Sequence, residues 1–496
     1  MNREREGGSM RLSKLIAALQ GVEIMEEKDW EREIIALSVD SRKTQESGLF
    51  VCLVGENVDG HNLVKEAQRN GAVAILAQRR VETSLPLFLV PDTRKALSIL
   101  ASVFYGEPSK RMRVIGITGT NGKTTTSYML ASILQAAGRR VGVIGTLGAV
   151  YMGKRCSTEL TTPDPIELNR LLAEMVSQGA EYVVMEVSAH ALHYQKTEGV
   201  SFAACIFTNF TQDHLDFFQD MKAYKEAKMK LFSPAVCPIA IVNGDEEVGR
   251  EIAAMREEVN TCVYALNTPA DCFAVVTDES LKSTECMLNL NDKLYRVHLH
   301  LLGEYNVYNA LAAASCAEGL GFSDYIAEGL SSVEGVRGRL QWVGELHGAA
   351  IYVDFAHTPD GLAKSLETLR KHCNGRLICL FGCGGNRDKG KRPIMGEMAA
   401  KKCDFCVLTS DNPRYEDPLD IIANIEVGYR RFSTSYVIVP NRERAIDYAL
   451  DCLQTGDILL IAGKGGEEYQ EIMGIKHPFN DQDMVEKFLK QKRKNF

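Results

Sequence analysis

Short apolar runs rich in β-branched residues alternate with amphipathic helical patterns through the middle of the chain. The runs include VIGITG, VGVIGT, YVVMEVS, ACIFTN and IAIVNGD, all after residue 113. The stretches between them, such as TTSYMLASILQAAG and IELNRLLAEMVSQG, carry apolar residues at the three- and four-residue spacing of a helix. Strands that alternate with helices predict a mostly parallel sheet, with ligands bound at the carboxyl ends of its strands.

A second alternation of this kind runs from about residue 341 to the end of the chain, through IYVDFA, LICLFG, FCVLTSD, YVIVP and ILLIAG. It predicts a separate doubly wound domain. Strands and helices also mix near the start of the chain, and Gly-Glu-Pro at 106–108 favours a boundary there. We therefore predict an α/β protein with three domains at 10–106, 107–336 and 337–496, preceded by a disordered extension at 1–9.

Composition agrees with this division and excludes several classes of protein. A chain of 496 residues suggests three domains at about 150 residues each. Charged residues make up 25% and hydrophobic residues 45%, which excludes a mainly disordered chain. The net charge of −8 disfavours general binding to nucleic acid.

Location follows from what the sequence lacks. No apolar run reaches the length of about 18 residues that a membrane span requires. The start, MNREREGGSMRLSKL, has no apolar core of a secretory signal, so we expect a cytoplasmic protein. The 14 cysteines are then expected to be reduced thiols, including the pair Cys403 and Cys406.

The sharpest local feature is GITGTNGKT at 116–124, between the strand-like RVIGI and a helical pattern. Gly119 and Gly122 allow backbone N–H groups to turn towards phosphate oxygens, and Lys123 adds a positive charge. The hydroxyl of Thr124 is a suitable Mg²⁺ ligand. Ile117 stands six residues before the lysine, which departs from the usual Walker A spacing. The order of strand, loop and helix still predicts a nucleotide site.

Two further candidates follow later strands of the same alternation. Glu186 ends YVVMEVS, and His214 lies in TNFTQDHLD. Taken alone, each has an ordinary structural explanation, as a capping carboxylate or a hydrogen-bonded loop histidine. Both are expected at the edge of the sheet that carries the phosphate loop, where they could complete a Mg²⁺ site.

Several motifs together resemble the Mur ligases, which are ATP-dependent amide-bond-forming enzymes of peptidoglycan precursor synthesis. The motifs are GITGTNGKTTT, TTPDP (161–165), MEVSAHAL (185–192), TNFTQDHLD (208–216), LLGEYNVYNALAA (301–313) and DFAHTPDGL (354–362). The resemblance runs from about residue 39 to residue 469. Two later loops, GCGGNRDKGKRP (382–393) and DNPRYEDP (411–418), resemble those of members that add meso-diaminopimelate.

The resemblance implies a domain for a UDP-sugar, a central P-loop ATPase with a mostly parallel sheet, and a C-terminal Rossmann-like domain for the incoming amino acid. ATP would phosphorylate a carboxylate of UDP-N-acetylmuramoyl-L-alanyl-D-glutamate, and an amine of meso-diaminopimelate would displace the phosphate. ATP and Mg²⁺ are the implied cofactors. We expect a monomer that acts on small molecules, without nucleic acid or membrane.

Site residues carry over where positions match. Catalytic roles are implied for Lys123, Glu186, His214 and Lys228, and the metal ligands would be Thr124, Glu186, His214 and a carbamylated Lys228. Those implied for ATP are Gly119, Thr120, Asn121, Gly122, Lys123, Thr124, Thr125, Asn306, Asn309, Arg339, Asp354 and His357. Those implied for the UDP-sugar substrate are Ser41, Thr161, Thr162, Ser188 and Lys196. Those implied for diaminopimelate are Arg387, Asp411, Asn412, Pro413, Arg414, Gly463 and Glu467.

The choice of amino acid can be argued from charge. Meso-diaminopimelate carries an ammonium and a carboxylate at its far end, whereas lysine carries only the ammonium. Arg414 offers a fork for the carboxylate, Arg387 a second cation, and Glu467 an acceptor for the ammonium. On this argument lysine is rejected because it would leave the Arg414 guanidinium unpaired.

The chain also departs from the pattern of the family, at Lys196, Arg337, Gln341 and Gly466. Three alternatives stay open from the sequence. They are a ligase that adds lysine or another diamino acid, a ligase like folylpolyglutamate synthetase, and a nucleotide-dependent switch protein.

Overall fold

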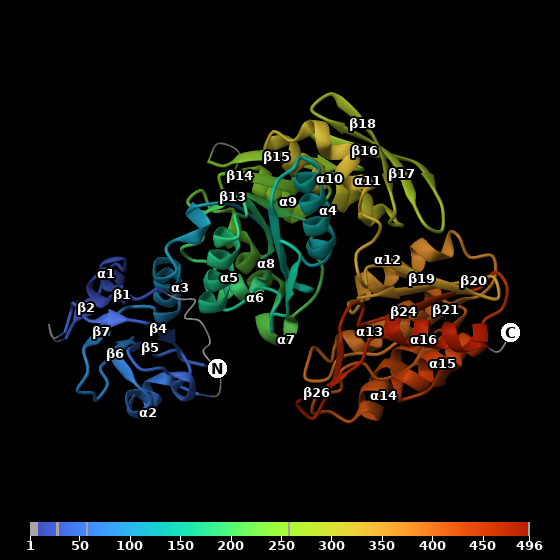
Figure 1. The fold of residues 1–496 in the computed structure, drawn as a ribbon. Coiled ribbons are helices and arrows are strands. Elements are labelled where there is room, and N and C mark those ends of the chain that lie inside the picture. The colour runs from blue at the N-terminus through green and yellow to red at the C-terminus, as the bar shows by residue number, and fades with distance from the viewer. Residues whose placement is uncertain (1–7, 26–28, 56–57, 256–257, 495–496) are drawn as a thin grey trace. The chain divides into compact units, whose positions relative to one another are not determined.

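The computed structural model describes residues 8–25, 29–55, 58–255 and 258–494. The chain divides into two compact units. Figure 1 shows their helices and strands, coloured in chain order. The first unit comprises Met1–Gly116, Arg139–Cys205 and Ser233–Pro238, and the second comprises Ile117–Gly138, Ile206–Phe232 and Ile239–Phe496. Of the extension predicted at 1–9, residues 1–7 lie outside the described residues.

The N-terminal part of the first unit is a five-stranded sheet of order β2-β7-β6-β5-β4, parallel except for the antiparallel pair β2 and β7. Alternation along β5 places Leu49 and Val51 towards α1 and α3, and Phe50 towards α2. A small β1–β3 ladder completes this part. The elements are β1 (Met10–Arg11), α1 (Leu12–Ala17), β2 (Glu23–Ile24), β3 (Glu33–Ile34), β4 (Ala36–Ser38), β5 (Gly48–Val51), α2 (Val64–Arg69), β6 (Ala72–Ala77), β7 (Leu87–Leu89) and α3 (Thr93–Phe104).

The middle of the chain contributes strands to both units, and β8 (Arg113–Thr118) and β13 (Phe202–Phe207) begin in the first unit and end in the second. In the first unit β9 and β12 are parallel, and β10 and β11 extend β9 as antiparallel hairpins. The elements of this part are β9 (Val141–Gly145), β10 (Gly148–Tyr151), β11 (Lys154–Cys156), α5 (Pro165–Ser177), β12 (Tyr182–Glu186) and α6 (Ala189–His193).

In the second unit the central strands β14, β15 and β16 are parallel, and β17 and β18 continue as antiparallel hairpins. Helix α10 packs against α4 and against β14 to β17. The elements are α4 (Lys123–Ala136), α7 (Leu215–Phe218), α8 (Met221–Met229), β14 (Ile239–Asn243), α9 (Glu247–Ala253), β15 (Asn260–Ala265), β16 (Cys272–Glu279), β17 (Thr284–Leu290), β18 (Lys293–Leu299), α10 (Glu304–Gly319) and α11 (Ile326–Ser331).

The C-terminal part of the second unit is a three-layered, doubly wound sheet of order β19-β20-β24-β21-β22-β23. Tyr352 on β20 faces α12, α13 and α14, whereas its neighbours Ile351 and Val353 face α15 and α16. The elements are β19 (Gln341–Leu346), β20 (Ala349–Asp354), α12 (Pro359–Arg370), β21 (Leu377–Phe381), α13 (Lys391–Lys402), β22 (Phe405–Leu408), α14 (Pro418–Tyr429), β23 (Tyr436–Ile438), α15 (Arg442–Asp451), β24 (Ile458–Ala462), β25 (Tyr469–Ile472), β26 (Ile475–Pro478) and α16 (Asp481–Lys494).

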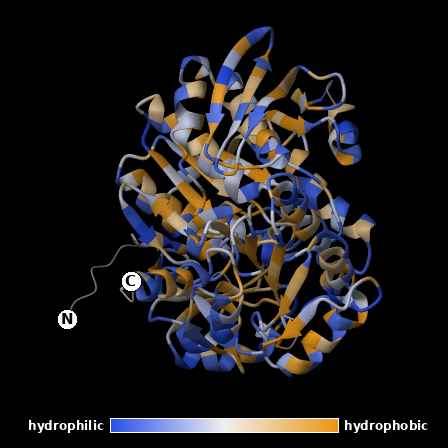
Figure 2. Cartoon of the chain, turned by 90° about the vertical axis from the view of Figure 1, so that its right-hand side faces the viewer, coloured by the Kyte–Doolittle hydropathy of each residue, from blue (hydrophilic) through white to orange (hydrophobic). Residues whose placement is uncertain are grey.

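The predicted strands and helices of both alternations are confirmed, and the α/β class with them. Hydrophobic residues concentrate on strands and hydrophilic residues on loops and outer helix turns (Figure 2). All 14 cysteines of the chain are described and none forms a disulfide, and Cys403 and Cys406 are both buried. Among the described residues, no helix combines the length and apolar character needed to cross a bilayer.

Candidate active site

The phosphate loop connects β8 to α4, and its path depends on two glycines. Gly119 and Gly122 have φ of +148° and +85°, where other residues are strained. A Cβ on Gly119 would stand 1.9 Å from Thr208 Oγ1, and a Cβ on Gly122 would stand 2.3 Å from Asn309 Oδ1. The backbone therefore makes the tight, glycine-dependent turn into a helix N-terminus that the motif predicts.

Residues that follow β13 hold this loop in place. The N–H of Thr120 donates to Asn209 O at 2.9 Å, and the N–H of Asn121 donates to Asn209 Oδ1 at 2.8 Å. The hydroxyl of Thr208 donates to Asn121 O at 2.7 Å. Sequence reasoning noted the motif TNFTQDHLD but assigned neither Thr208 nor Asn209 a role, since only the fold brings them to the loop.

Two lysine side chains converge on one carbonyl of the loop. Lys123 Nζ donates to the carbonyls of Gly119 and Thr120, at 2.9 and 2.8 Å. Lys228 Nζ, from α8, donates to the same Gly119 oxygen at 2.7 Å. Lys228 is buried, and burial together with the charge of Lys123 holds the pKa of its amine well below the ordinary value. The site therefore favours the neutral form of Lys228.

Asp213 is the centre of a charged cluster that the sequence did not predict. Its carboxylate lies 3.3 Å from His214 Nε2, 3.9 Å from His357 Nε2 and 3.9 Å from Lys391 Nζ. Burial would raise the pKa of Asp213, but the charges of His214, His357 and Lys391 outweigh it and lower the pKa to about 2. Burial and the charge of Lys391 lower the pKa of His357 to about 4, so this imidazole is charged at the low pH where Asp213 titrates and is neutral at pH 7.

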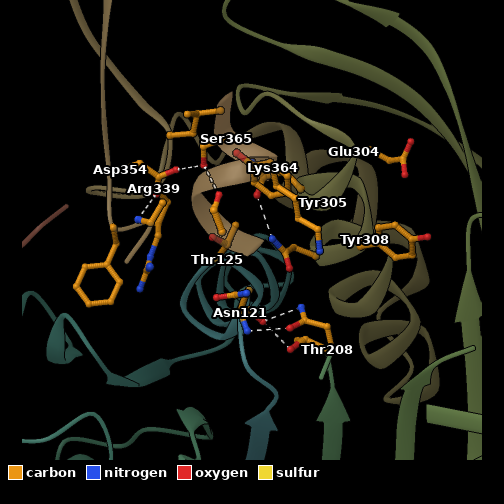
Figure 3. Close-up of a pocket in the computed structure, with 18 of the residues that line it drawn as sticks. Asn121, Thr125, Thr208, Glu304, Tyr305, Tyr308, Arg339, Asp354, Lys364 and Ser365 are labelled. Carbon is orange, nitrogen blue, oxygen red and sulfur yellow. Dashed lines mark hydrogen bonds between the residues drawn. The ribbon is translucent and has the colours of Figure 1, made fainter. Parts of the chain in front are cut away.

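A cavity of about 300 Å³ opens beside the phosphate loop and contains most of the residues implied for ATP (Figure 3). Its walls come from the loop, from the strand ends after β13, β14 and β15, from α10, and from the start of the C-terminal part. Predicted members of its lining are Asn121, Gly122, Thr125, Asn306, Asn309, Arg339, Asp354 and His357. Members that were not predicted include Asn209, Asp245, Tyr264, Tyr308 and Lys364.

The two asparagines of α10 form a chain of hydrogen bonds that reaches α4. Asn306 Nδ2 donates to Leu302 O at 2.7 Å, and Asn309 Nδ2 donates to Asn306 Oδ1 at 3.0 Å. Asn309 Oδ1 in turn accepts from the Thr126 hydroxyl on α4 at 3.3 Å. Both asparagines are buried, so their amides are held in position at the wall of the cavity.

Residues that follow 336 reach the phosphate loop. Arg339 Nη2 donates to Thr124 Oγ1 at 2.8 Å, and its guanidinium lies 4.5 Å from the centre of the Phe355 ring. Asp354, at the end of β20, accepts from the Ser365 hydroxyl at 2.6 Å, and burial raises the pKa of its carboxyl. The cavity is thus completed by the C-terminal part of the same unit.

A second set of predicted residues gathers where two loops of the C-terminal sheet meet. The N–H of Gly385 donates to Asn412 O at 2.9 Å, and a Cβ on Gly385 would stand 1.9 Å from Pro413 O. The loop 382–393 therefore lies directly against the loop 411–418. Gly463 packs against them too, because a Cβ there would stand 2.5 Å from Asp411 Oδ2.

The charged members of this set are close together. A Cβ on Gly384 would stand 2.9 Å from Arg414 Nη1 and 3.6 Å from Arg387 Cγ, so both arginines border the same glycine. Glu467 Oε2 accepts from Lys464 Nζ and from Asn412 Nδ2, both at 2.8 Å. Its carboxylate is therefore already neutralised by a buried lysine.

Arg414 is paired in the structure. The prediction that it would lack a partner without a far carboxylate is therefore wrong. In the structure Arg414 Nε lies 3.1 Å from Glu471 Oε2, and Arg414 Nη1 donates to Gly385 O at 2.9 Å. Glu471 comes from β25, a strand without the apolar pattern by which strands were predicted.

The departures from the family pattern have structural counterparts. Arg337 pairs with Glu468, and Gln341 Oε1 accepts from the Gly338 N–H at 2.9 Å. Gly466 lies against Gly338, because a Cβ added to Gly338 would stand 2.0 Å from Gly466 N. The glycine at 466 therefore belongs to a close backbone contact.

In the first unit, the loop 161–165 packs on the end of β12. Glu186 Oε1 accepts from the Thr146 N–H at 2.8 Å, and Glu186 Oε2 accepts from the Thr146 hydroxyl at 3.0 Å. Thr162 Oγ1 donates to Glu186 O at 2.9 Å and accepts from the Ser188 N–H at 3.0 Å. Thr161 Oγ1 lies 3.2 Å from Thr146 Oγ1. The structure thus brings Thr161, Thr162, Glu186 and Ser188 together.

The two remaining residues implied for the UDP-sugar have other partners. Lys196 Nζ lies 2.7 Å from Asp164 Oδ1, beside the loop 161–165. The hydroxyl of Ser41 donates to Glu66 Oε2 on α2 at 2.6 Å, within the N-terminal sheet domain. Lys196 therefore belongs to the group around that loop, and Ser41 has a separate set of contacts.

Comparison with known proteins defines the class. The Mur ligase catalytic, middle and glutamate ligase domains match residues 33–105, 117–317 and 338–465. A UDP-N-acetylmuramoyl-L-alanyl-D-glutamate–2,6-diaminopimelate ligase of Syntrophomonas wolfei is 41% identical over 97% of this chain and 100% of that protein. The protein of the same name in Geobacillus thermodenitrificans is 38% identical over 98% and 100%. The chain belongs to the Mur ligase family.

Solved structures agree with this assignment. A structure named as a UDP-N-acetylmuramoyl-L-alanyl-D-glutamate–2,6-diaminopimelate ligase has a TM-score of 0.69 at 30% identity, covering 98% of this chain and 100% of that chain. The MurF ligase of Thermotoga maritima in complex with ADP has a TM-score of 0.63 at 22% identity, covering 93% and 98%. The similarity to MurF shows a shared fold, which is the three-domain α/β architecture expected from the sequence.

Proposed function

We propose that the chain is an ATP-dependent ligase that adds meso-diaminopimelate to UDP-N-acetylmuramoyl-L-alanyl-D-glutamate in peptidoglycan precursor synthesis. The main support for this function is a sequence identity of about 40%, over nearly the full length of the chain, to ligases of that name. The paired loops 382–393 and 411–418, with Arg387 and Arg414 beside one glycine, suit an amino acid with a second carboxylate.

The reaction balances in two steps. The γ-phosphoryl group of ATP moves to a carboxylate oxygen of the UDP-linked substrate, which gives an acyl phosphate and ADP. The amine nitrogen of the amino acid attacks the acyl carbon, the C–O bond to phosphate breaks, and phosphate and the amide leave with loss of a proton. Such transfers depend on positioning and charge neutralisation, which Lys123, Arg339 and the N-terminus of α4 supply.

The ATP site is proposed to be the cavity of Figure 3 together with the phosphate loop. Loop residues 119–125 would hold the phosphates, and Asn306 and Asn309 would bind the nucleoside side. Arg339, Asp354 and His357 would contribute from the C-terminal part. Support comes from their convergence on one cavity, where the two asparagines are fixed by hydrogen bonds and Arg339 contacts Thr124.

Mg²⁺ is proposed to bind with ATP through Thr124, Glu186, His214 and Lys228 as a carbamate. Among the described residues, no group of three or more His, Cys, Asp or Glu side chains suits a metal ion, so the proposed set is a mixed one. Three of the four donors, the hydroxyl, carboxylate and carbamate oxygens, are those that Mg²⁺ prefers, and His214 would add an imidazole nitrogen. When bound, the ion would neutralise charge on the transferring phosphoryl group.

Carbamylation of Lys228 fits its surroundings. Carbon dioxide reacts with a neutral amine. Lys228 is buried beside the ammonium of Lys123, and both conditions favour the neutral form of its amine. The neutral amine nitrogen of Lys228 would bond to the carbon of carbon dioxide as one C=O π bond opens onto oxygen, and the nitrogen would release a proton, so that the amine becomes an anionic carbamate. That anion would lie next to Lys123, where a positive charge is repelled and a negative charge is attracted.

The remaining assignments follow the motifs. Ser41, Thr161, Thr162, Ser188 and Lys196 are proposed to bind the UDP-sugar substrate. Residues 10–106, 107–336 and 337–496 are proposed as the domains, each containing one of the family matches. We propose a monomer in the cytoplasm, which size-exclusion chromatography with light scattering can check.

A phosphate-release assay tests the function. The enzyme is given ATP, Mg²⁺, UDP-N-acetylmuramoyl-L-alanyl-D-glutamate and one amino acid, either meso-diaminopimelate, L-lysine or L-glutamate. We expect release and a new amide product with meso-diaminopimelate, and far less with the other two. Faster turnover with L-lysine or L-glutamate than with meso-diaminopimelate would overturn the assignment.

A further inference from the structure

A second cavity, of about 640 Å³, lies in the second unit and shares Leu340 with the cavity beside the phosphate loop. Its walls come from the turn between β16 and β17, from the residues that follow β18, from the segment 334–342 and from the start of α16. Of the described residues that line it, none is proposed above to bind ATP, the UDP-sugar or the amino acid. A cavity of this size can hold a small molecule.

Two buried side chains fix the turn 280–283, which forms one wall of the second cavity. The hydroxyl of Tyr352, on β20, donates to Leu281 O at 2.5 Å. The hydroxyl of Thr284 donates to Leu301 O at 2.9 Å, which joins the turn to the residues after β18. Both side chains are buried, so the turn is held against the C-terminal sheet and the wall is formed before any ligand binds.

The aromatic surface of the second cavity is Trp342, on β19. The chain has two tryptophans, and the other one, Trp30, packs edge-on against Phe88 with their ring centres 5.7 Å apart. Trp342 is 39% exposed, so part of its indole ring is available to a ligand. An exposed indole in a cavity is typical of a site that binds a flat, partly apolar molecule.

Lys282 is the cation beside that indole. Its Nζ lies 4.1 Å from the centre of the Trp342 ring, and within the described residues Lys282 forms no ion pair. Arg337 also lines the cavity, but its guanidinium is already in an ion pair. Of the two carboxylates in the lining, Asp483 lies in the first turn of α16, whose dipole compensates its charge, and Glu334 is exposed to solvent. Lys282 is therefore a cation held in place without a counter-ion.

We propose that the second cavity is a regulatory site for a small aromatic anion, whose ring lies against Trp342 and whose negative group pairs with Lys282. The cation–π contact already positions the ammonium, so little side-chain freedom is lost when the anion binds. An aromatic cation would instead have to displace Lys282 from the indole. The site is separate from the residues of the proposed ligase reaction and adds a ligand to them.

Two short connections link the second cavity to the nucleotide cavity. Leu302 lines the second cavity, and its carbonyl accepts from Asn306 Nδ2 at 2.7 Å. Leu340 lines both cavities and is adjacent to Arg339, which donates to Thr124. Leu340 has φ of +39°, a strained conformation that a branched residue keeps only while its surroundings hold it. A ligand against Leu340 would therefore support the backbone that places Arg339, and would tighten nucleotide binding.

Two fluorescent probes with the same rings separate stacking from charge. The anion is 1-anilinonaphthalene-8-sulfonate, and the neutral probe is N-phenyl-1-naphthylamine, which lacks the sulfonate. Both would be titrated into the full-length protein at saturating ADP, so that the nucleotide cavity is already occupied. The variants are Trp342→Ala and Lys282→Gln. The control is Lys293→Gln, an exposed lysine at the start of β18 that does not line the cavity.

We expect Trp342→Ala to weaken binding of both probes about tenfold, because both rings lose the indole. Lys282→Gln should weaken the sulfonate about fivefold and the neutral probe less than twofold, since only the sulfonate loses a charged contact. Lys293→Gln should change neither value. In the wild-type protein, saturating sulfonate probe should lower the Kd of ADP about fivefold, and in Trp342→Ala it should not. Unchanged thermal unfolding would show that the variants are folded.

Several results would overturn the proposal. Displacement of the probes by ADP would locate them in the nucleotide cavity, and unchanged binding in Trp342→Ala would locate them elsewhere on the protein. Equal loss of both probes in Lys282→Gln would mean that the lysine only shapes the wall. Tighter binding of an aromatic cation, thioflavin T, would reverse the charge of the ligand. An unchanged Kd of ADP would remove the regulatory role. None of these results depends on which amino acid the enzyme adds.

Discussion

At the phosphate loop, Gly119 O is the acceptor for two ammonium groups, those of Lys123 and Lys228. Two positive charges this close repel each other, and the buried amine is the one that is more easily deprotonated. The pKa of Lys228 is lowered by burial first and by Lys123 second. Under the proposed function, Lys123 would contact phosphate, and Lys228 would react as a neutral amine.

The first prediction concerns Lys123. Replacing it with alanine should reduce ATP-dependent phosphate release by about 100-fold or more, because one positive contact to the transferring group is lost. The measurement is phosphate release at saturating substrates, with circular dichroism to check folding. A folded variant with near wild-type turnover would contradict the assignment of the loop.

The second prediction concerns Lys228. Lys228→Ala should lose activity, and a short carboxylic acid added to the assay should restore part of it by replacing the carbamate oxygens. The matched control is Lys225→Ala on the same helix, since Lys225 pairs with Glu251 at 2.8 Å away from the loop. Activity in Lys228→Ala equal to that of the control, with or without the acid, would disprove the carbamate.

At the scale of elements, the loop 411–418 is anchored by an ion pair with helix α13. Arg392 donates to both oxygens of Glu416 at 3.0 and 2.9 Å, and both side chains are largely buried. Arg392 is the main cause that lowers the pKa of Glu416 to about 2. The pair therefore connects the loop that carries Arg414 to the helix that follows the loop 382–393.

The third prediction is a pH dependence of stability. A carboxyl whose pKa is lower in the folded state adds stability that is complete above its unfolded value, near 4.5, and is lost as the pH falls through about 2. Glu416→Gln should cost on the order of 2 kcal/mol at pH 7 and less at pH 3.5. Urea unfolding at the two pH values measures this.

A control variant makes that test specific. Glu397→Gln removes an exposed ion pair with Lys401 four residues away, and it should shift the urea midpoint little at either pH. A cost for Glu416→Gln that is the same at pH 7 and pH 3.5 would contradict the argument.

The elements that could be predicted were those with a strong periodic pattern. The strands β8, β12, β20, β21 and β24 are continuous apolar runs because their side chains are buried on both faces of the sheet. Strand β16 was not predicted, since from Phe273 onward much of it is exposed and its pattern is weak. Strands β25 and β26 were missed for the same reason.

Part of the candidate site could likewise be predicted from the sequence, and part could not. The phosphate loop is contiguous, so its spacing alone predicted a turn that needs Gly119 and Gly122. The cluster around Asp213 joins residues that are far apart in sequence, and only the fold places Lys391 beside it. Glu471 escaped notice because no motif includes it.

At the scale of the whole molecule, the cavity beside the phosphate loop is built from segments on both sides of residue 336. Arg339 lines it and donates to Thr124, while Asn121 Nδ2 donates to Asp360 Oδ2 at 3.3 Å. A nucleotide in this cavity would therefore touch the middle and C-terminal parts at once. Binding energy would hold these parts together and exclude water from the acyl phosphate.

The last prediction tests this coupling through Arg339. ADP at 100 times its dissociation constant should stabilise the wild-type protein by about 2.7 kcal/mol, seen as a higher melting temperature. Arg339→Ala should bind ADP about tenfold more weakly in calorimetry, since one cationic contact is lost, and its melting temperature should rise less at the same ADP concentration. Arg337→Ala is the control, because Arg337 pairs with Glu468 and does not line the cavity. Equal stabilisation of the two variants by ADP would mean that Arg339 takes no share in nucleotide binding.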